Sequence, residues 1–158
     1  KHRDNFLKLT KDGFFDNTEF HRVIKDFVIQ GGDPNSKDND RSNDGRGGPG
    51  YTIDKEIDST ILKHDYGMVG AARLGDATNP ERASNGSQFY VVVDKNGEHG
   101  LDGAYTVFGK IIDGMDAADA ISLVKVNAQG LPQDRLPMQV DVVEYSHNQL
   151  KDSFNFVP

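Results

Sequence analysis

The residues best suited to chemistry gather in one short stretch, 20–33. Apolar and polar residues alternate at its start, the pattern breaks at 25–26, and a second apolar run ends in a Gly-Gly-Asp turn. This pattern predicts a β-hairpin that brings Arg22, Phe27 and Gln30 close together. A cation, an aromatic ring and an amide on one surface suit an extended peptide better than a phosphate or a metal ion.

Short strands and two helices are expected around this hairpin, which spans residues 18–30. Alternating or buried apolar runs predict further strands at 67–72, 88–93, 105–112 and 138–145. Helical spacing predicts helices at 4–12 and 115–123. Residues 33–50 are polar and rich in glycine, which predicts a long surface loop. Many short strands with only two helices favour a β-barrel.

Composition narrows the function. The 158 residues form one domain by length. A net charge of −7, with no run rich in Lys and Arg, argues against nucleic acid as a partner. The chain has no Cys, so disulfides and thiolate chemistry are excluded. No apolar stretch approaches the length that spans a membrane.

A metal site is not expected. Asp40 to Asp44 resembles the opening of a calcium loop, but its twelfth position is Tyr51, where a bidentate Glu is required. Weak, incidental binding of a cation at this loop is compatible with the sequence, but a dedicated calcium site is not. The histidines show no ligand spacing, and His21 faces the opposite side of its strand from Arg22, so it is expected to be a structural histidine with its polar atoms satisfied.

The hairpin sequence closely resembles the signature of the cyclophilins, the peptidyl-prolyl cis/trans isomerases. Two further family signatures follow in order, at 84–90 (Ser-Asn-Gly-Ser-Gln-Phe-Tyr) and at 101–109 (Leu-Asp-Gly-Ala-Tyr-Thr-Val-Phe-Gly). The resemblance implies a mainly β fold, an antiparallel eight-stranded barrel capped by two helices. It covers residues 1–147 and leaves a C-terminal tail at 148–158.

The resemblance also implies that something precedes Lys1. The chain starts in the middle of the family's first helix, so the two opening strands of the barrel are expected to be missing from this sequence. The final strand, around 140–145, would then lack a neighbour. A signal or lipid-anchor segment could have been lost with them, which leaves a bacterial cytoplasm, a periplasm or a lipid-anchored position open.

Isomerisation of an X–Pro bond explains which residues matter. The barrier of about 18–20 kcal/mol comes from amide resonance, so a catalyst needs a proline pocket, a clamp on the flanking backbone and a donor to the twisted nitrogen. The resemblance assigns catalysis to Arg22, with Gln30 holding Arg22 or the substrate backbone. It assigns substrate binding to eight further residues: Phe27, Val28, Ala72, Arg73, Gln88, Tyr90, Leu101 and Tyr105.

Four positions depart from common family members. Tyr90 replaces Phe, which is expected to put a hydroxyl at the pocket edge, and Val28 replaces Met. Tyr105 replaces His, as in bacterial members. Gly100 replaces the Trp associated with cyclosporin, so weak cyclosporin binding is expected.

The resemblance implies a cofactor-free, monomeric isomerase of bacterial type that acts on proline-containing peptides and unfolded polypeptides. Two alternatives stay open. One is a non-catalytic module of the same fold that binds proline peptides. The other is an assembly or structural module in which the barrel only holds a partner.

Overall fold

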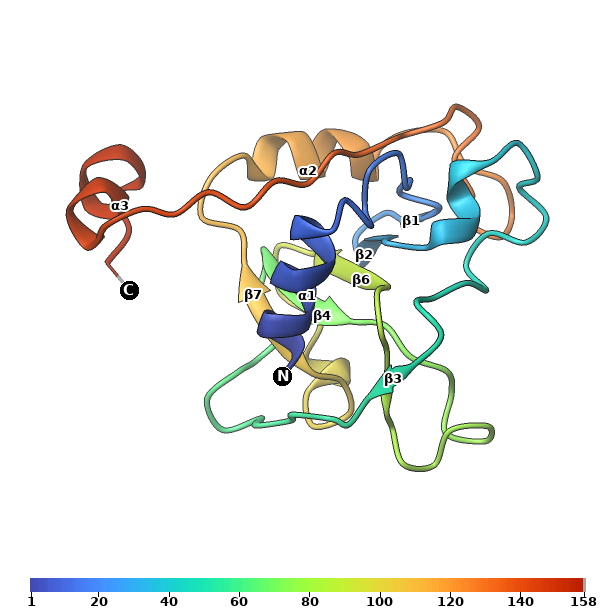
Figure 1. The fold of residues 1–158 in the computed structure, drawn as a ribbon, viewed down its shortest axis with the longest axis horizontal. Coiled ribbons are helices and arrows are strands. Elements are labelled where there is room, and N and C mark those ends of the chain that lie inside the picture. Colours follow the sequence, from blue (N-terminus) through green and yellow to red (C-terminus); the bar gives the residue numbers. More distant parts are fainter. Residues whose placement is uncertain (158) are drawn as a thin grey trace.

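A five-stranded antiparallel sheet forms the centre of the computed structural model, which describes residues 1–157 (Figure 1). The order of the strands in this sheet is β1-β2-β6-β4-β7. Their bounds are Arg22–Ile24 for β1, Val28–Gly31 for β2, Met68–Ala71 for β4, Phe89–Val92 for β6 and Val107–Lys110 for β7. Two short strands, β3 (Thr52–Ile53) and β5 (Ser84–Asn85), pair separately. The mainly β architecture predicted from the sequence is confirmed.

The hairpin predicted at 18–30 is formed by β1 and β2. Arg22 lies directly opposite Gln30 in this pair. Asp26 makes the turn with a φ of 53°, a left-handed conformation that Asp tolerates better than most residues. Because side chains alternate across a strand, Arg22 and Gln30 share one face while Val23 and Ile29 point to the other, into the core.

Two helices cover the sheet where the sequence predicted them. α1 (His2–Lys11) packs near β7, and α2 (Met115–Ser122) lies over β1 and β2 (Figure 1). Phe6 of α1 joins Phe15 and Phe89 in an aromatic cluster. Ile121 of α2 packs on the apolar face of the hairpin. Within residues 1–157, none of the helices is long and apolar enough to cross a membrane.

The loop expected at 33–50 is present and is anchored by a buried carboxylate. Asp33 is fully buried and accepts hydrogen bonds from the backbone N–H groups of Asn35 and Gly45. It also caps a short 3-10 helix, η1 (Pro34–Lys37). A second 3-10 helix, η2, covers His99–Leu101. The glycine-rich loop is therefore fastened to the end of β2, next to the hairpin.

The strand predicted at 138–145 is not formed. Pro137 makes an isolated bridge with Glu19, and Met138 exchanges backbone hydrogen bonds with Asn17 and Thr18. Beyond Met138 the backbone groups of 139–145 have no backbone partner among residues 1–157. An extended segment becomes a strand only where a neighbour supplies donors and acceptors, and here the described chain supplies none.

The tail contains a helix that the sequence analysis did not anticipate. α3 (His147–Phe154) begins with a capping box, in which Ser146 and Gln149 satisfy each other's backbone N–H groups. It stands away from the sheet, at the end of the extended segment (Figure 1).

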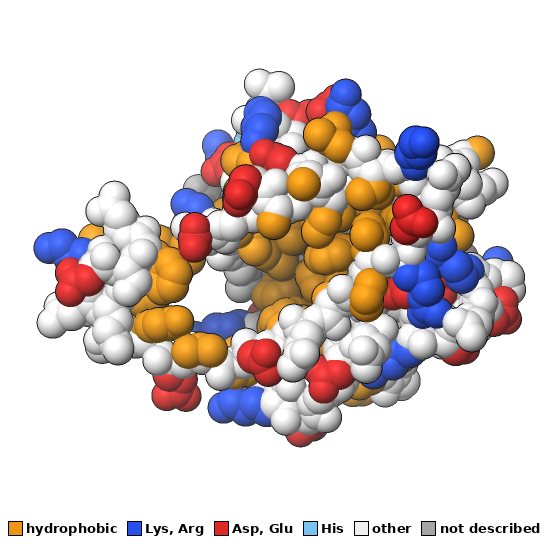
Figure 2. All heavy atoms as spheres, turned by 90° about the horizontal axis from the view of Figure 1, so that it is seen from above, with side chains coloured by type: hydrophobic (Ala, Val, Ile, Leu, Met, Phe, Trp, Pro, Cys, Tyr) orange, Lys and Arg blue, Asp and Glu red, His pale blue; other side chains and the backbone are white. Residues whose placement is uncertain are grey.

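A broad apolar hollow opens between α1, β7 and residues 138–140. Its volume is about 460 Å³. Apolar side chains dominate its lining, among them Leu7, Phe20, Val69, Val91, Phe108 and Val140. In Figure 2, apolar side chains form the floor of a wide hollow.

Candidate active site

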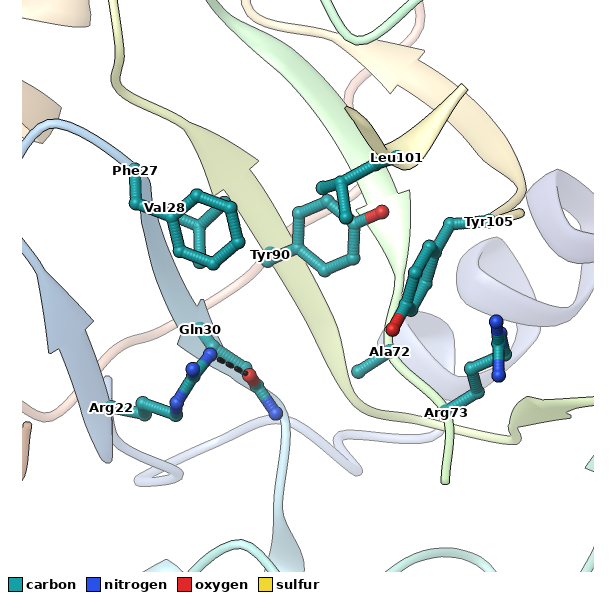
Figure 3. Close-up of a pocket in the computed structure, with 9 residues that line it drawn as sticks. All are labelled: Arg22, Phe27, Val28, Gln30, Ala72, Arg73, Tyr90, Leu101 and Tyr105. Carbon is teal, nitrogen blue, oxygen red and sulfur yellow. Dashed lines mark hydrogen bonds between the residues drawn. The ribbon is translucent and has the colours of Figure 1, made fainter. Parts of the chain in front are cut away.

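One cavity brings together nine of the ten residues that the sequence analysis assigned to the site (Figure 3). Its volume is about 320 Å³. The lining residues are Arg22, Phe27, Val28, Gln30, Ala72, Arg73, Tyr90, Leu101 and Tyr105. They come from β1, β2 and the turn between these strands, from β6 and η2, and from the segments that follow β4 and η2.

A polar wall runs across neighbouring strands. Arg22 donates from Nη1 to Gln30 Oε1 at 3.2 Å (Figure 3). Gln30 Nε2 then donates to Gln88 Oε1 at 3.0 Å, and Gln88 Nε2 donates to the carbonyls of Gly45 and Gly47. The guanidinium is thus held by a chain of amides that ends on the 33–50 loop.

The structure places Gln88 outside the cavity lining. Its side chain is buried, and both its amide oxygen and its amide nitrogen are hydrogen-bonded, so it fixes the position of the Gln30 side chain. Gln88 does not line this cavity, and its expected contact with a bound substrate stays a prediction. Its position in the amide chain follows from three-dimensional contacts that no sequence spacing indicates.

Tyr90 forms the floor of the apolar part, with Phe27 and Leu101 packed around it. In register it lies opposite Gln30 on one side and Gly70 on the other. A Cβ at Gly70 would come within 2.3 Å of the Tyr90 ring, so only glycine leaves room for the ring there. Gly70 is a residue of the site that sequence reasoning missed.

The Tyr90 hydroxyl points into the protein, not to the pocket edge as expected. It pairs with His64 Nε2 at 2.9 Å, and Asp102 pairs with His64 Nδ1 at 2.8 Å. Burial raises the pKa of Tyr90, so the hydroxyl stays protonated. Although burial opposes ionisation of Asp102, hydrogen bonds from His64 and His99 hold its pKa below the usual value. Sequence reasoning gave His64 no role, because its partners lie far away along the chain.

Tyr105 forms the wall opposite the hairpin and is held by Arg73. The Arg73 guanidinium lies 4.3 Å from the centre of the Tyr105 ring. It also donates from Nε to the Ala104 carbonyl at 3.0 Å and pairs with Asp76 at 2.7 Å. The charge of Arg73 is therefore satisfied by the protein, and its side chain stiffens the wall.

The main chain beside the cavity is left partly unpaired. The N–H and C=O of Ala72 are engaged by Gln88 and Asn85. Among residues 1–157, the N–H and C=O of Arg73 have no backbone partner. An extended peptide could pair there as an added strand.

The arrangement suits binding and hydrogen bonding more than covalent chemistry. An apolar pocket lies beside one fixed cationic donor, with a free stretch of main chain on the other side. Within the part of the chain that the structure describes, no group of three or more His, Cys, Asp or Glu side chains could hold a metal ion.

Comparison with known proteins identifies the family. The model of the cyclophilin type peptidyl-prolyl cis-trans isomerases matches residues 1–144. Peptidyl-prolyl cis-trans isomerase B of Bacillus subtilis is 40% identical over 118 residues, which cover 75% of this chain and 72% of the relative. The human peptidyl-prolyl cis-trans isomerase-like 1 is 35% identical over 133 residues, covering 82% and 71%.

A solved structure agrees with these relatives. A cyclophilin type isomerase of Cryptosporidium parvum, crystallised in the presence of the dipeptide Ala-Pro, superposes with a TM-score of 0.74 at 33% identity. The match covers 90% of this chain and 84% of that one. This chain belongs to the cyclophilin-type peptidyl-prolyl cis/trans isomerases. Its relatives include proteins of both bacteria and eukaryotes, so its bacterial type stays a prediction.

Proposed function

We propose that this chain isomerises X–Pro bonds of peptides and unfolded polypeptides in the cavity around Tyr90, with Arg22 as the donor that favours the twisted amide. The observation that carries this proposal is the Arg22–Gln30 pair, fixed at 3.2 Å in the wall of an apolar pocket. The proline ring would sit on Tyr90, between Phe27 and Leu101.

The chemistry follows from the electronic change during rotation. When the amide twists, its nitrogen becomes pyramidal and regains a lone pair, so a hydrogen bond to it is stronger than in the planar ground state. An interaction that strengthens only in the transition state raises the rate. Arg22 remains charged throughout, because a guanidinium does not lose its proton in proteins.

Arg22 does not account for the whole effect. A hydrogen bond to a charged group contributes about 1.5–3 kcal/mol, which corresponds to about ten- to a hundredfold in rate. An acceleration of ~10⁵ would need about 7 kcal/mol. The remainder is assigned to the pocket, which excludes water and holds the two sides of the rotating bond differently.

The clamp is assigned to the main chain at Arg73. Its unpaired N–H and C=O would pair with the peptide on one side of the proline, while the ring is fixed on the other side. Rotation then occurs between one fixed strand and one fixed ring. The Cryptosporidium parvum structure was determined in the presence of the dipeptide Ala-Pro, which supports a proline-containing ligand for this fold.

The finer parts of the proposal are a bacterial-type enzyme that needs no cofactor, binds cyclosporin weakly and is monomeric when additional polypeptide covers the apolar hollow. Gly100 is exposed and a side chain there would meet nothing within 4 Å, so the apolar wall that a Trp would supply is missing. The domain is taken as residues 1–147, so α3 begins at its last residue and continues into the tail.

An isomerisation assay on an X–Pro tetrapeptide separates this proposal from its rivals. We expect exchange between cis and trans to accelerate in proportion to protein concentration, measured by exchange NMR without a coupling protease. Binding of the peptide without acceleration would support the non-catalytic module. Neither binding nor acceleration would favour an assembly role.

A further inference from the structure

A second cavity joins the active site across Arg22 and Gln30. Its volume is about 570 Å³, and both residues line the two cavities. Its other walls are residues 41–46 of the long loop and residues 127–131 after α2. The two walls are tied to each other and to the hairpin. Arg41 donates to the Pro132 carbonyl at 2.8 Å, and Val23 of β1 donates to the Gly130 carbonyl at 2.7 Å.

Positive charge dominates this lining. Arg22, Arg41 and Arg46 face it, against the carboxylate of Asp44 in the lining and that of Glu19 behind it, which lies 3.8 Å from Arg41 Nη2. Asp44 lies 3.7 Å from Arg41 Nε, and burial raises the pKa of its carboxyl. Arg46 is exposed, and its guanidinium makes no hydrogen bond or ion pair with residues 1–157. In a chain with a net charge of −7, such a concentration of cations is local to this cavity.

Buried polar atoms at the cavity also lack partners. His21 lines it and is 4% exposed, yet within residues 1–157 neither ring nitrogen makes a hydrogen bond of good geometry. Nε and Nη2 of Arg41 make no hydrogen bond of good geometry either, although they lie 3.7 Å from Asp44 Oδ2 and 3.8 Å from Glu19 Oε2. The Glu19 backbone and the Gln88 side chain lie near the ring, so the expected structural role of His21 is met only through poorly aligned contacts. Buried polar groups without partners are rare, because each costs free energy, and an ordered water, an ion or a ligand would complete them.

The imidazole of His21 can both donate and accept a hydrogen bond in this cavity. Burial lowers its pKa, and the nearby Asp33 carboxylate opposes this only in part. At neutral pH the ring is uncharged, with one donor and one acceptor nitrogen. Together with the guanidinium groups, it offers donors for a carboxylate.

We propose that this second cavity is a subsite for an acidic side chain of the substrate, Asp or Glu, within three residues of the isomerising proline. The inference rests on the proposed function. A peptide that crosses Arg22 continues at about 3.3 Å per residue, so one to three residues carry its chain from the proline pocket over the shared wall. The carboxylate would meet the free guanidinium of Arg46, with the His21 ring and the Arg41 guanidinium beside it.

The test is a set of proline peptides that differ only by Glu, Gln or Lys at each position up to three residues before and after the proline. We expect one position at which kcat/KM for Glu exceeds that for Gln by about three- to tenfold, as a partly exposed charged hydrogen bond allows. Lys should be worst at that same position. The preference should weaken as salt is added.

Two variants of the exposed Arg46 assign the preference to this cavity. Arg46→Ala should bring the Glu-to-Gln ratio close to one, and Arg46→Glu should reverse the order so that Lys exceeds Glu. Arg3→Ala on α1 removes the same charge far from the site and should keep the wild-type ratio.

Two outcomes would overturn the inference. The first is equal kcat/KM for Glu, Gln and Lys at every position in an active enzyme. The second is a Glu preference that survives Arg46→Glu. A protein inactive on every peptide would instead contradict the proposed function, so the two failures are distinguishable.

Discussion

The Tyr90 side chain has two environments. Its ring floors the cavity, while its hydroxyl lies in the interior at 2.9 Å from His64 Nε2. Asp102, kept ionised by its hydrogen bonds, pairs with His64 Nδ1, and the other ring nitrogen, Nε2, pairs with the Tyr90 hydroxyl. The floor of the pocket is therefore held by a buried polar chain, so its position depends on residues that do not touch the substrate.

Tyr90→Phe should separate these two environments. The variant leaves the buried His64 Nε2 without a partner, which should lower the free energy of unfolding by about 1–3 kcal/mol. The ring remains, so kcat/KM should fall by less than tenfold. Urea unfolding and the tetrapeptide assay measure both. Unchanged stability would show that the hydroxyl does not hold the floor.

Asp102 predicts a pH dependence of stability. Its folded pKa lies below the ordinary value of 3.8, so its contribution is complete above that value and is lost as the pH falls through the folded pKa. Asp102→Asn should therefore be less stable than the wild type at pH 7, and the difference should shrink as the pH falls towards 3. Thermal unfolding across that range tests this. A difference independent of pH would contradict it.

At the scale of elements, the catalytic cavity depends on the register of the central strands. Opposite positions on β1, β2, β6 and β4 place Arg22, Gln30, Tyr90 and Gly70 in one row across the sheet. The first three bear the groups of the site. The glycine provides the space that the Tyr90 ring occupies.

Gly70→Ala should damage the site from within β4. The added Cβ would come within 2.3 Å of the Tyr90 ring, which must shift toward the cavity. Overpacking of this kind costs about 1–3 kcal/mol in stability, and kcat/KM should fall with it. Gly100→Ala is the matched control, because its Cβ meets nothing within 4 Å. Equal behaviour of the two variants would rule out the packing argument.

An element could be predicted from the sequence where neighbouring residues determine it, and could not where it depends on distant segments. The hairpin and both covering helices could be predicted because alternation, helical spacing and a turn at 25–26 are written in neighbouring residues. Residues 138–145 carry a strand-like pattern, but strand formation needs a pairing partner, and none is present among the described residues. The roles of His64 and Gly70 depend on contacts between distant segments, which one sequence does not reveal.

At the scale of the whole molecule, the apolar hollow beside α1 is the surface that most lacks a packing partner. Its lining is apolar, β7 is the last strand of the sheet on that side, and the backbone of 139–145 is unpaired nearby. An exposed apolar patch next to unpaired strand edges favours association. Two further strands stay a prediction, and this hollow is where we expect additional polypeptide to pack.

Residues 1–158 alone should therefore bind a hydrophobic dye strongly and self-associate as concentration rises, measured by fluorescence and analytical ultracentrifugation. Leu7→Lys or Val140→Lys should reduce both effects, since each puts a charge in the lining. A longer polypeptide whose added residues cover the hollow should be monomeric and bind little dye. A monomeric 1–158 protein without dye binding would contradict the prediction.

The most direct test of the central claim is kcat/KM for X–Pro isomerisation in Arg22→Ala, with stability measured on the same sample. We predict a loss of about ten- to a hundredfold or more, with the free energy of unfolding within about 1 kcal/mol of the wild type, because this surface residue is partly exposed and acts in the transition state. Full activity in the variant would contradict the account. Loss of folding would show instead that Arg22 is structural.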